Sequence, residues 1–149
     1  MKKSDFRLVQ SIRVRWAEVD AQGIVFNPHY LMYADIGVTE YYRAIGMPYP
    51  DAFQVEAEDL FTKKSTIVYH ASARYDDEID ILVRVARLGK SSFDFLVGVF
   101  RGDEALAEIL ITYVNANPHT RKSVPLADAF KNKICDFEVI SPEGSAQRV

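Results

Sequence analysis

The sequence of 149 residues has one cysteine, Cys135, and no apolar run near the roughly 20 residues that cross a bilayer as a helix. A lone cysteine cannot close a disulfide within the chain, and no Cys and His residues have the spacing of a structural zinc site. We therefore expect a cytoplasmic protein of a reducing compartment, with no membrane segment and no bound metal.

Basic residues are also scarce relative to acidic ones, with 18 Lys and Arg against 21 Asp and Glu and a formal charge of −3. Proteins that coat nucleic acid or an anionic membrane surface do so through an excess of Lys and Arg. We therefore expect no nucleic acid and no membrane partner. The sequence has no internal repeat and no interdomain linker, so residues 1–140 are expected to form one domain and 141–149 a tail.

The apolar pattern predicts one long helix among five strands. Alternating apolar residues from Phe6 to Trp16 predict a half-buried strand, and residues 17–26 lose the alternation and are typical of a loop. A helix is expected from Pro28 to Ile45, with Asn27 as its N-cap and Gly46 near its end. Further strands are expected at residues 61–75, 79–88, 92–101 and 105–114, and a short helix at 125–135.

The predicted fold class is α+β, with a five-stranded antiparallel sheet wrapped around one long helix. The connectors 76–78, 89–91 and 102–104 are short and polar, so consecutive strands are expected to pair antiparallel as a meander. The apolar face of the helix is wider than that of a helix lying on a protein surface, so we expect the sheet to cover most of it. Because such a sheet leaves an open edge and part of the helix uncovered, we expect a homo-oligomer, a dimer or a dimer of dimers.

The densest group of polar and small residues lies between Trp16 and Tyr30. Asp20 falls in the loop before the helix, near free N–H groups and the positive end of the helix dipole. A carboxylate can act as general base or nucleophile at a carbonyl carbon, while amides at a helix start stabilise the oxyanion. The alternative is a loop aspartate that caps a turn, with Gly23 supplying backbone freedom.

This segment resembles the signature of the 4-hydroxybenzoyl-CoA thioesterase family of hotdog-fold proteins. The signature has an acidic residue, a spacer, an Asp, a Gly three positions further and an aromatic-rich helix start. The residues that carry it here are Glu18, Asp20, Gly23, Ile24, Val25, Phe26 and Tyr30. The resemblance is good from about Val14 to Gly46 and only architectural beyond.

The resemblance implies hydrolysis of an acyl-CoA thioester to a free acid and CoA. Asp20 would be the catalytic carboxylate, and the amide of Asn27 would polarise the thioester carbonyl. Many members have His or Tyr at the position of Asn27, so the backbone amide is the group expected to act there. CoA is part of the substrate, and no separate cofactor is implied. The residues expected to contact the substrate near this site are Gly23, Phe26, His29 and Tyr30.

CoA carries a 3′-phosphate and a diphosphate, which call for cations even on an acidic protein. In the family, the turn between the third and fourth strands lies near the CoA nucleotide. The resemblance therefore implies Lys90 as the preferred phosphate contact and Arg87 as the second, with Ser91 beside them. The alternative is a turn lysine that is merely solvated.

Two other functions remain open. A hydratase or dehydratase on the same scaffold needs a His with a carboxylate partner, and His29 with Asp35 is the pair to consider, although six residues separate them by roughly 9 Å along the helix. A protein that binds an acyl-CoA or another hydrophobic ligand without turning it over is the second alternative, because fold alone does not establish activity.

Overall fold

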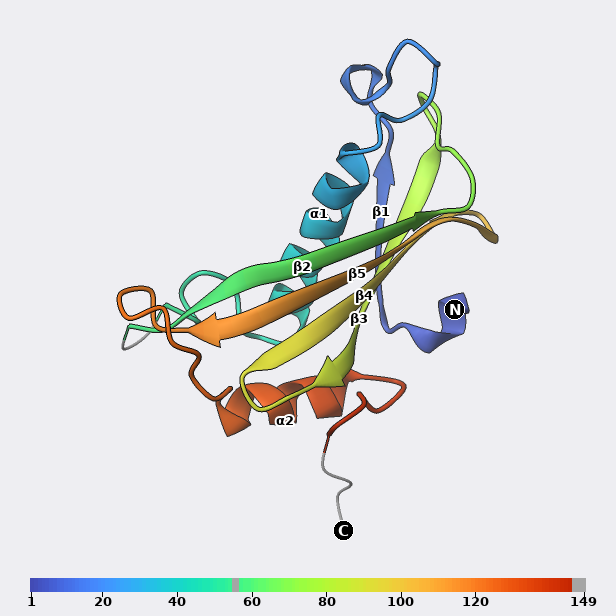
Figure 1. Ribbon diagram of the computed structural model, residues 1–149. Coiled ribbons are helices and arrows are strands. Elements are labelled where there is room, and N and C mark those ends of the chain that lie inside the picture. Colours follow the sequence, from blue (N-terminus) through green and yellow to red (C-terminus); the bar gives the residue numbers. More distant parts are fainter. Residues whose placement is uncertain (55–56, 146–149) are drawn as a thin grey trace.

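The computed structural model describes residues 1–54 and 57–145, which form one sheet with a long helix packed against it (Figure 1). The strands are β1 (Leu8–Arg13), β2 (Asp59–Tyr69), β3 (Glu78–Leu88), β4 (Ser92–Arg101) and β5 (Glu104–Ala116). The helices are α1 (His29–Ala44) and α2 (Asp128–Phe137), with 3-10 turns η1 (Lys3–Asp5) and η2 (Trp16–Glu18). The five strands are antiparallel in the order β1-β3-β4-β5-β2, which confirms the expected α+β class.

The position of β2 differs from the expected meander. The meander is correct for β3, β4 and β5 but wrong for β2, which pairs with β5 at the edge of the sheet. The short connector at 76–78 resembles a hairpin turn, but both edges of β3 are already taken by β1 and β4. The strand expected to reach Tyr75 ends at Tyr69, and residues 70–77 carry the chain across the end of the sheet.

Helix α1 lies unusually close to β3 because a glycine faces the strand. A Cβ atom at Gly37 would lie 2.6 Å from Cγ2 of Val83 and 2.7 Å from Cγ2 of Ile81. The helix begins one residue later than expected. Pro28 occupies the N-cap position with a helical backbone and no capping side-chain bond is made, so the prediction of Asn27 as N-cap is wrong. Asn27 is held by a backbone hydrogen bond instead, because its carbonyl accepts the Tyr30 N–H at 3.3 Å.

Both terminal segments contact the sheet. Phe6 packs with Leu82 and Phe100 on the face of the sheet opposite α1. In the expected tail, the Leu88 N–H donates to the Glu143 carbonyl at 2.8 Å and the Glu143 N–H donates to Ala86 at 2.8 Å, so this part pairs with β3. Residues 146–149 of that tail lie outside the described residues. No helix in the described ranges is long and apolar enough to cross a membrane.

Candidate active site

A cleft of about 310 Å³ opens where α1 begins and β2 ends. Its two walls are tied together by hydrogen bonds. The Val25 N–H donates to the Ala73 carbonyl at 2.9 Å, and the Ala73 N–H donates to the Tyr30 hydroxyl at 3.0 Å. The Tyr69 hydroxyl donates to the Asn27 carbonyl at 3.2 Å. The residues that line the cleft are Ile24, Val25, Asn27, Tyr30, Tyr69, His70, Ala71 and Ser72.

Asn27, two residues before the start of α1, is one of the residues that line this cleft. The Phe26 carbonyl accepts the His29 N–H at 2.9 Å, which fixes the peptide between Phe26 and Asn27. Because a trans peptide is planar, the Asn27 N–H points away from that carbonyl. Among residues 1–54 and 57–145 this N–H has no hydrogen-bond partner. A residue that lines the cleft therefore carries a backbone donor without a partner among the described residues.

Asp20 lies in a tight loop next to the cleft and is half-buried. Its N–H donates to the Ile24 carbonyl at 3.0 Å, its carbonyl accepts the Gly23 N–H at 3.0 Å, and its Oδ1 accepts the Gln22 N–H at 2.8 Å. Gly23 has φ +75°, the left-handed conformation that glycine adopts without strain. The carboxylate thus caps the turn through one oxygen. Asp20 itself does not line the cleft, although Ile24, to which it is bonded, does.

The other acid of the motif, Glu18, is a buried structural anchor of this loop. Its carboxylate accepts the Tyr33 hydroxyl, the Arg15 N–H and the Arg15 Nε, each at 2.8 Å. Burial acts to raise the pKa of Glu18, but the hydrogen bonds from Arg15 and Tyr33 outweigh it and hold the pKa below its ordinary value. The resemblance identified this residue only as an acid, without its role.

The expected substrate residues near the helix start divide into two groups. Tyr30 is buried and lines the cleft, and burial raises the pKa of its hydroxyl. Phe26 and His29 do not line it; their ring centroids lie 6.2 Å apart in an edge-to-face arrangement, and His29 Nδ1 lies 3.2 Å from Met32 Sδ. Asp35 is exposed and is also outside the lining, so the pair considered for a hydratase does not meet at this cleft.

The wall formed by residues 69–72 was missed in the sequence. Tyr69, His70, Ala71 and Ser72 were expected within a continuous strand, and His70 has no ligand-like neighbour in sequence. The N–H groups of His70 and Ala71 donate to the Leu106 carbonyl at 2.8 and 3.2 Å, which bends the chain toward the start of α1. The spacing of residues along the chain does not predict that residues 69–72 lie beside the start of α1, because this contact depends on the placement of β2.

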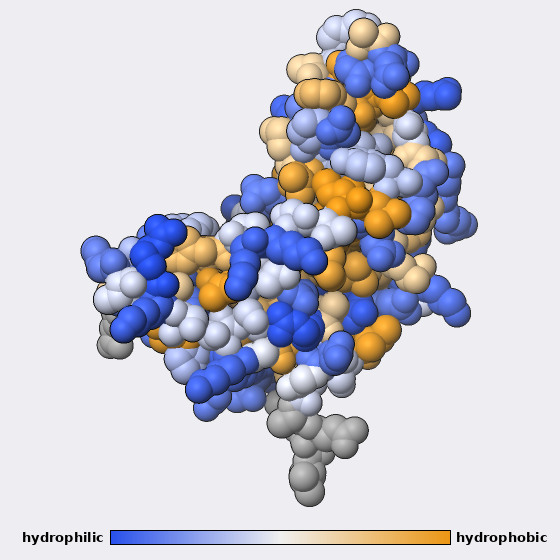
Figure 2. All heavy atoms as spheres, viewed as in Figure 1, coloured by the Kyte–Doolittle hydropathy of each residue, from blue (hydrophilic) through white to orange (hydrophobic). Residues whose placement is uncertain are grey.

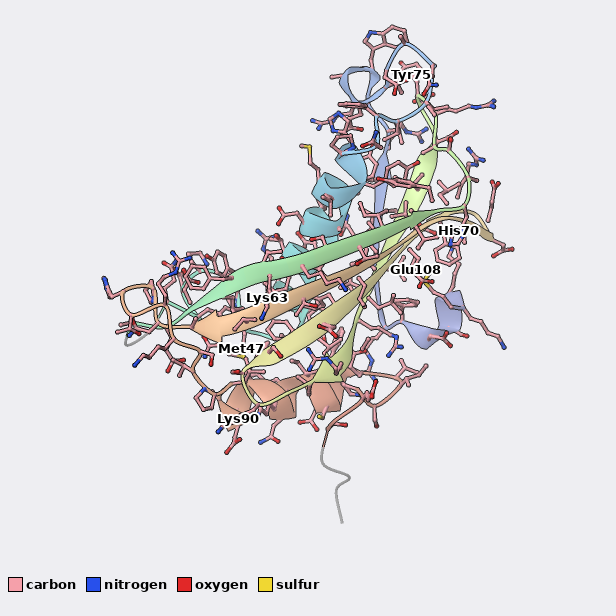
Figure 3. The ribbon with its side chains drawn as sticks, viewed as in Figure 1. Met47, Lys63, His70, Tyr75, Lys90 and Glu108 are labelled. Carbon is pink, nitrogen blue, oxygen red and sulfur yellow. The ribbon has the colours of Figure 1, made fainter. Side chains whose placement is uncertain are left out.

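The residues expected at the CoA nucleotide lie at the other end of the sheet. Lys90 is exposed in the turn beside α2 (Figure 3), whereas the loop of Asp20 lies where α1 begins (Figure 1). The Arg87 guanidinium binds the Asp94 carboxylate with two hydrogen bonds, of 2.7 and 3.0 Å. The Ser91 carbonyl accepts the Asn115 N–H at 2.8 Å. One chain therefore does not bring these residues together with Asp20.

The thioesterase-like superfamily is the family whose model matches this sequence, over residues 14–134. The chain belongs to that superfamily. The acyl-CoA thioester hydrolase YbgC of Escherichia coli is 25% identical over 117 residues, which cover 76% of the chain and 87% of YbgC. The predicted family resemblance is therefore confirmed.

Two solved structures share the fold. Slr0204, a 1,4-dihydroxy-2-naphthoyl-CoA thioesterase from Synechocystis, superposes with a TM-score of 0.80 at 18% identity, covering 86% of the chain and 95% of Slr0204. The protein AQ1494 from Aquifex aeolicus superposes with a TM-score of 0.78 at 24% identity, covering 85% of the chain and 98% of AQ1494. The predicted hotdog fold is confirmed.

Proposed function

We propose that the chain hydrolyses acyl-CoA thioesters to a free acid and CoA, with Asp20 as the catalytic carboxylate and the Asn27 amide as the oxyanion donor. The observation that carries this proposal is the free Asn27 N–H in a cleft whose wall includes Ile24, the residue that pairs with Asp20. Membership of the thioesterase-like superfamily supports the reaction class. A cytoplasmic location agrees with the single, unpaired Cys135.

In the general-base form of the reaction, the Asp20 carboxylate takes a proton from water as the water oxygen attacks the thioester carbonyl carbon. The carbonyl oxygen becomes an oxyanion that accepts the Asn27 N–H. Collapse of this intermediate breaks the C–S bond, and the CoA thiolate leaves and is protonated. In the nucleophilic form, Asp20 attacks the carbon directly and water then cleaves the mixed anhydride. Neither form requires a metal or a separate cofactor.

A second copy of the chain completes the site in this proposal. Asp20 does not line the cleft of its own chain, and Lys90 lies at the far end of the sheet. The cleft opens at the end of β2, an edge strand with unpaired backbone groups that can accept another strand. A homodimer formed at this edge, alone or within a dimer of dimers, would place the end of the sheet near Asp20 in one chain beside the end that carries Lys90 in the other.

The test is the release of CoA thiol from a panel of acyl-CoAs by the wild type and by Asp20→Asn. Asn keeps the oxygen that accepts the Gln22 N–H, so the turn should survive while the base is lost. We expect kcat to fall by at least about 100-fold with an unchanged melting temperature. Asp103→Asn, an exposed change in the turn between β4 and β5, is the matched control and should keep full activity.

Full activity in Asp20→Asn would remove this carboxylate from the mechanism. Saturable acyl-CoA binding by the wild type, without thiol release at any acyl length, would instead favour a binding protein. The assembly is checked by light scattering, where a monomer at working concentration would contradict the shared site.

A further inference from the structure

Residues 1–7 run across the face of the sheet opposite α1, and we call this segment the strap. Figure 1 shows η1, which is part of the strap, and α1 on opposite sides of β1. The Phe6 ring packs with Leu82 and Phe100, and all three residues are buried. The strap therefore covers apolar side chains on the side of the sheet away from the long helix.

Hydrogen bonds from Lys3 fasten the strap to the sheet. The Lys3 Nζ donates to the Asp80 carboxylate and to the Gly102 carbonyl, each at 2.7 Å. The bond from Lys3 is the largest of the effects that hold the pKa of Asp80 below its ordinary value. Hydrogen bonds between charged groups are about twice as strong as those between neutral ones. The strap is thus anchored by one buried ring and one charged side chain.

A glycine in β4 makes room for the start of the strap. A Cβ atom at Gly98 would lie 2.9 Å from Sδ of Met1 and 2.8 Å from Cε2 of Phe100. Both distances are shorter than real carbon contacts, so a larger residue at this position would displace one of the two side chains. The strap therefore lies directly on the backbone of the central strand.

The surface under and around the strap is apolar across several strands. Residues paired between antiparallel strands lie on the same face, and the pairing places Leu82 between Val9 of β1 and Gly98 of β4. The next row on this face pairs Leu96 with Leu110. Val9 and Leu110 are exposed. In the view of Figure 1 the sheet lies in front of α1, and Figure 2 shows hydrophobic residues over its middle with hydrophilic residues around them.

Such a face is suited to a second layer of structure. An antiparallel sheet that leaves one face in water normally carries polar residues there, whereas an apolar sheet face is buried against another layer. Two sheets that pack face to face lie about 10 Å apart, with their side chains interdigitated. A strap that lies on the backbone of β4 leaves no room for a second sheet at this distance. The strap and a second sheet therefore compete for the same surface.

The charges on this face fit a second copy of the chain better than a partner of one sign. Arg84 pairs with Leu96 and Glu108 pairs with Gly98, so both charged residues lie on this face. In the ranges 1–54 and 57–145, neither of them forms an ion pair, and the buried Nε of Arg84 has no hydrogen-bond partner. A two-fold arrangement of two such faces can bring the cation of each chain near the anion of the other.

We propose that the strap covers a surface on which the sheet of a second copy would otherwise pack, so that displacing the strap joins two assemblies face to face. This contact is separate from the edge of β2, at which the homodimer of the proposed function forms. With the strap in place the protein stops at that dimer. Without it, two dimers pack through their sheets into a dimer of dimers.

The test is the mass in solution, measured by size-exclusion chromatography with light scattering on full-length protein from about 1 to 200 µM. The wild type should keep one mass. The double variant Lys3→Gln/Phe6→Ser, which loses both anchors, should reach twice that mass at the high end of the range. Ser4→Ala, an exposed change within the strap, is the matched control and should behave as the wild type. Leu110→Lys, added to the double variant, places a charge on the apolar face and should restore the wild-type mass.

Circular dichroism and melting temperatures check that each variant is folded. If the double variant does not fold, Lys3→Gln alone decides, because it keeps Phe6 and its mass should still rise at the highest concentrations. A folded variant with the wild-type mass at every concentration would overturn the inference. A doubled mass that Leu110→Lys does not reverse would also overturn it, since the contact would then lie elsewhere. Release of CoA thiol per chain is measured separately, so failure of this inference leaves the thioesterase proposal standing.

Discussion

The Tyr33 hydroxyl on α1 donates a 2.8 Å hydrogen bond to the buried carboxylate of Glu18, two residues before Asp20. This bond joins the long helix to the loop that carries the proposed catalytic residue. Arg15 completes the arrangement with an ion pair of 2.7 Å to the same carboxylate. The position of Asp20 therefore depends on a second acid that has no place in the chemistry.

Glu18→Gln is expected to lower the free energy of unfolding by about 1.5–3 kcal/mol at pH 7, since charge-assisted hydrogen bonds to a buried group are lost. The folded-state pKa of Glu18 is below its ordinary value, so its contribution is present at neutral pH and is lost as the pH falls below about 4. Urea unfolding from pH 7 to 3 should therefore show a smaller loss of stability in the variant. Equal pH dependence would contradict the anchor role, and exposed Glu78→Gln is the control.

Glu138→Gln is expected to stabilise the protein at neutral pH by about 1 kcal/mol. Burial raises the pKa of Glu138, whose Oε1 accepts the Tyr41 hydroxyl at 2.5 Å and the Val85 N–H at 2.6 Å, while Oε2 has no hydrogen-bond partner among residues 1–54 and 57–145. A raised folded-state pKa means that stability is full below the ordinary Glu pKa and declines as the pH rises toward the folded value.

Thermal unfolding between pH 4 and 8 checks this second glutamate. The wild type should lose stability across that interval, and Glu138→Gln should lose less, because an uncharged amide can still accept both hydrogen bonds. Glu138→Ala, which leaves the Tyr41 hydroxyl and the Val85 N–H without an acceptor, should be destabilised at every pH. A stability in Glu138→Gln that is lower than in the wild type at pH 8 would refute the prediction.

Gly37→Ala is expected to destabilise the fold by about 1–3 kcal/mol, because the added methyl would meet Val83 and Ile81 on β3 at less than van der Waals distance. Helix propensity alone predicts the opposite, a gain of about 1 kcal/mol. Chemical denaturation decides between them, with Ala44→Gly at the exposed end of α1 as a control for propensity. A more stable Gly37→Ala would show that the helix can move away from the sheet at little cost.

Asn27→Ala is expected to keep kcat within a few-fold, because only the backbone N–H of this residue is assigned a role. Asn27→Pro removes that N–H and should lower kcat by about 100- to 1,000-fold. Melting temperatures of both variants report whether the start of α1 survives the change. A large loss in Asn27→Ala with an intact fold would assign the chemistry to the side-chain amide instead.

The elements that sequence predicts best are those with a local signal. The alternating apolar residues predicted the bounds of β3 and β4 to within a residue or two, and Gly46 did the same for the end of α1. The pairing of β2 with β5 could not be derived, because it is set by which strand edges remain free and not by the connector at 76–78. The wall formed by Tyr69 and His70 has the same origin.

Only the part of the site that lies within one short segment of the sequence was predictable. The loop of Asp20, its glycine turn and the helix start lie within one segment, so their proximity follows from spacing. The anchoring by Tyr33 depends on the rotation of α1 relative to that loop, which spacing along the chain does not give. The contact made by Arg87 could not be predicted either. Its bidentate contact with Asp94 uses the pairing of β3 with β4, which a cation count along the sequence does not reveal.

The pairing of Asp59 with Ala116 has a consequence for biosynthesis. During translation β2 leaves the ribosome well before β5, its neighbour in the sheet that the structure describes, and it must wait until the chain has been extended past Ala116. Its contacts are therefore long-range in sequence, which slows their formation relative to the hairpins of β3, β4 and β5. The nascent chain therefore holds its cleft-forming strand without a sheet partner until β5 has emerged, so the mouth of the cleft cannot take shape before residues far along the sequence have been made.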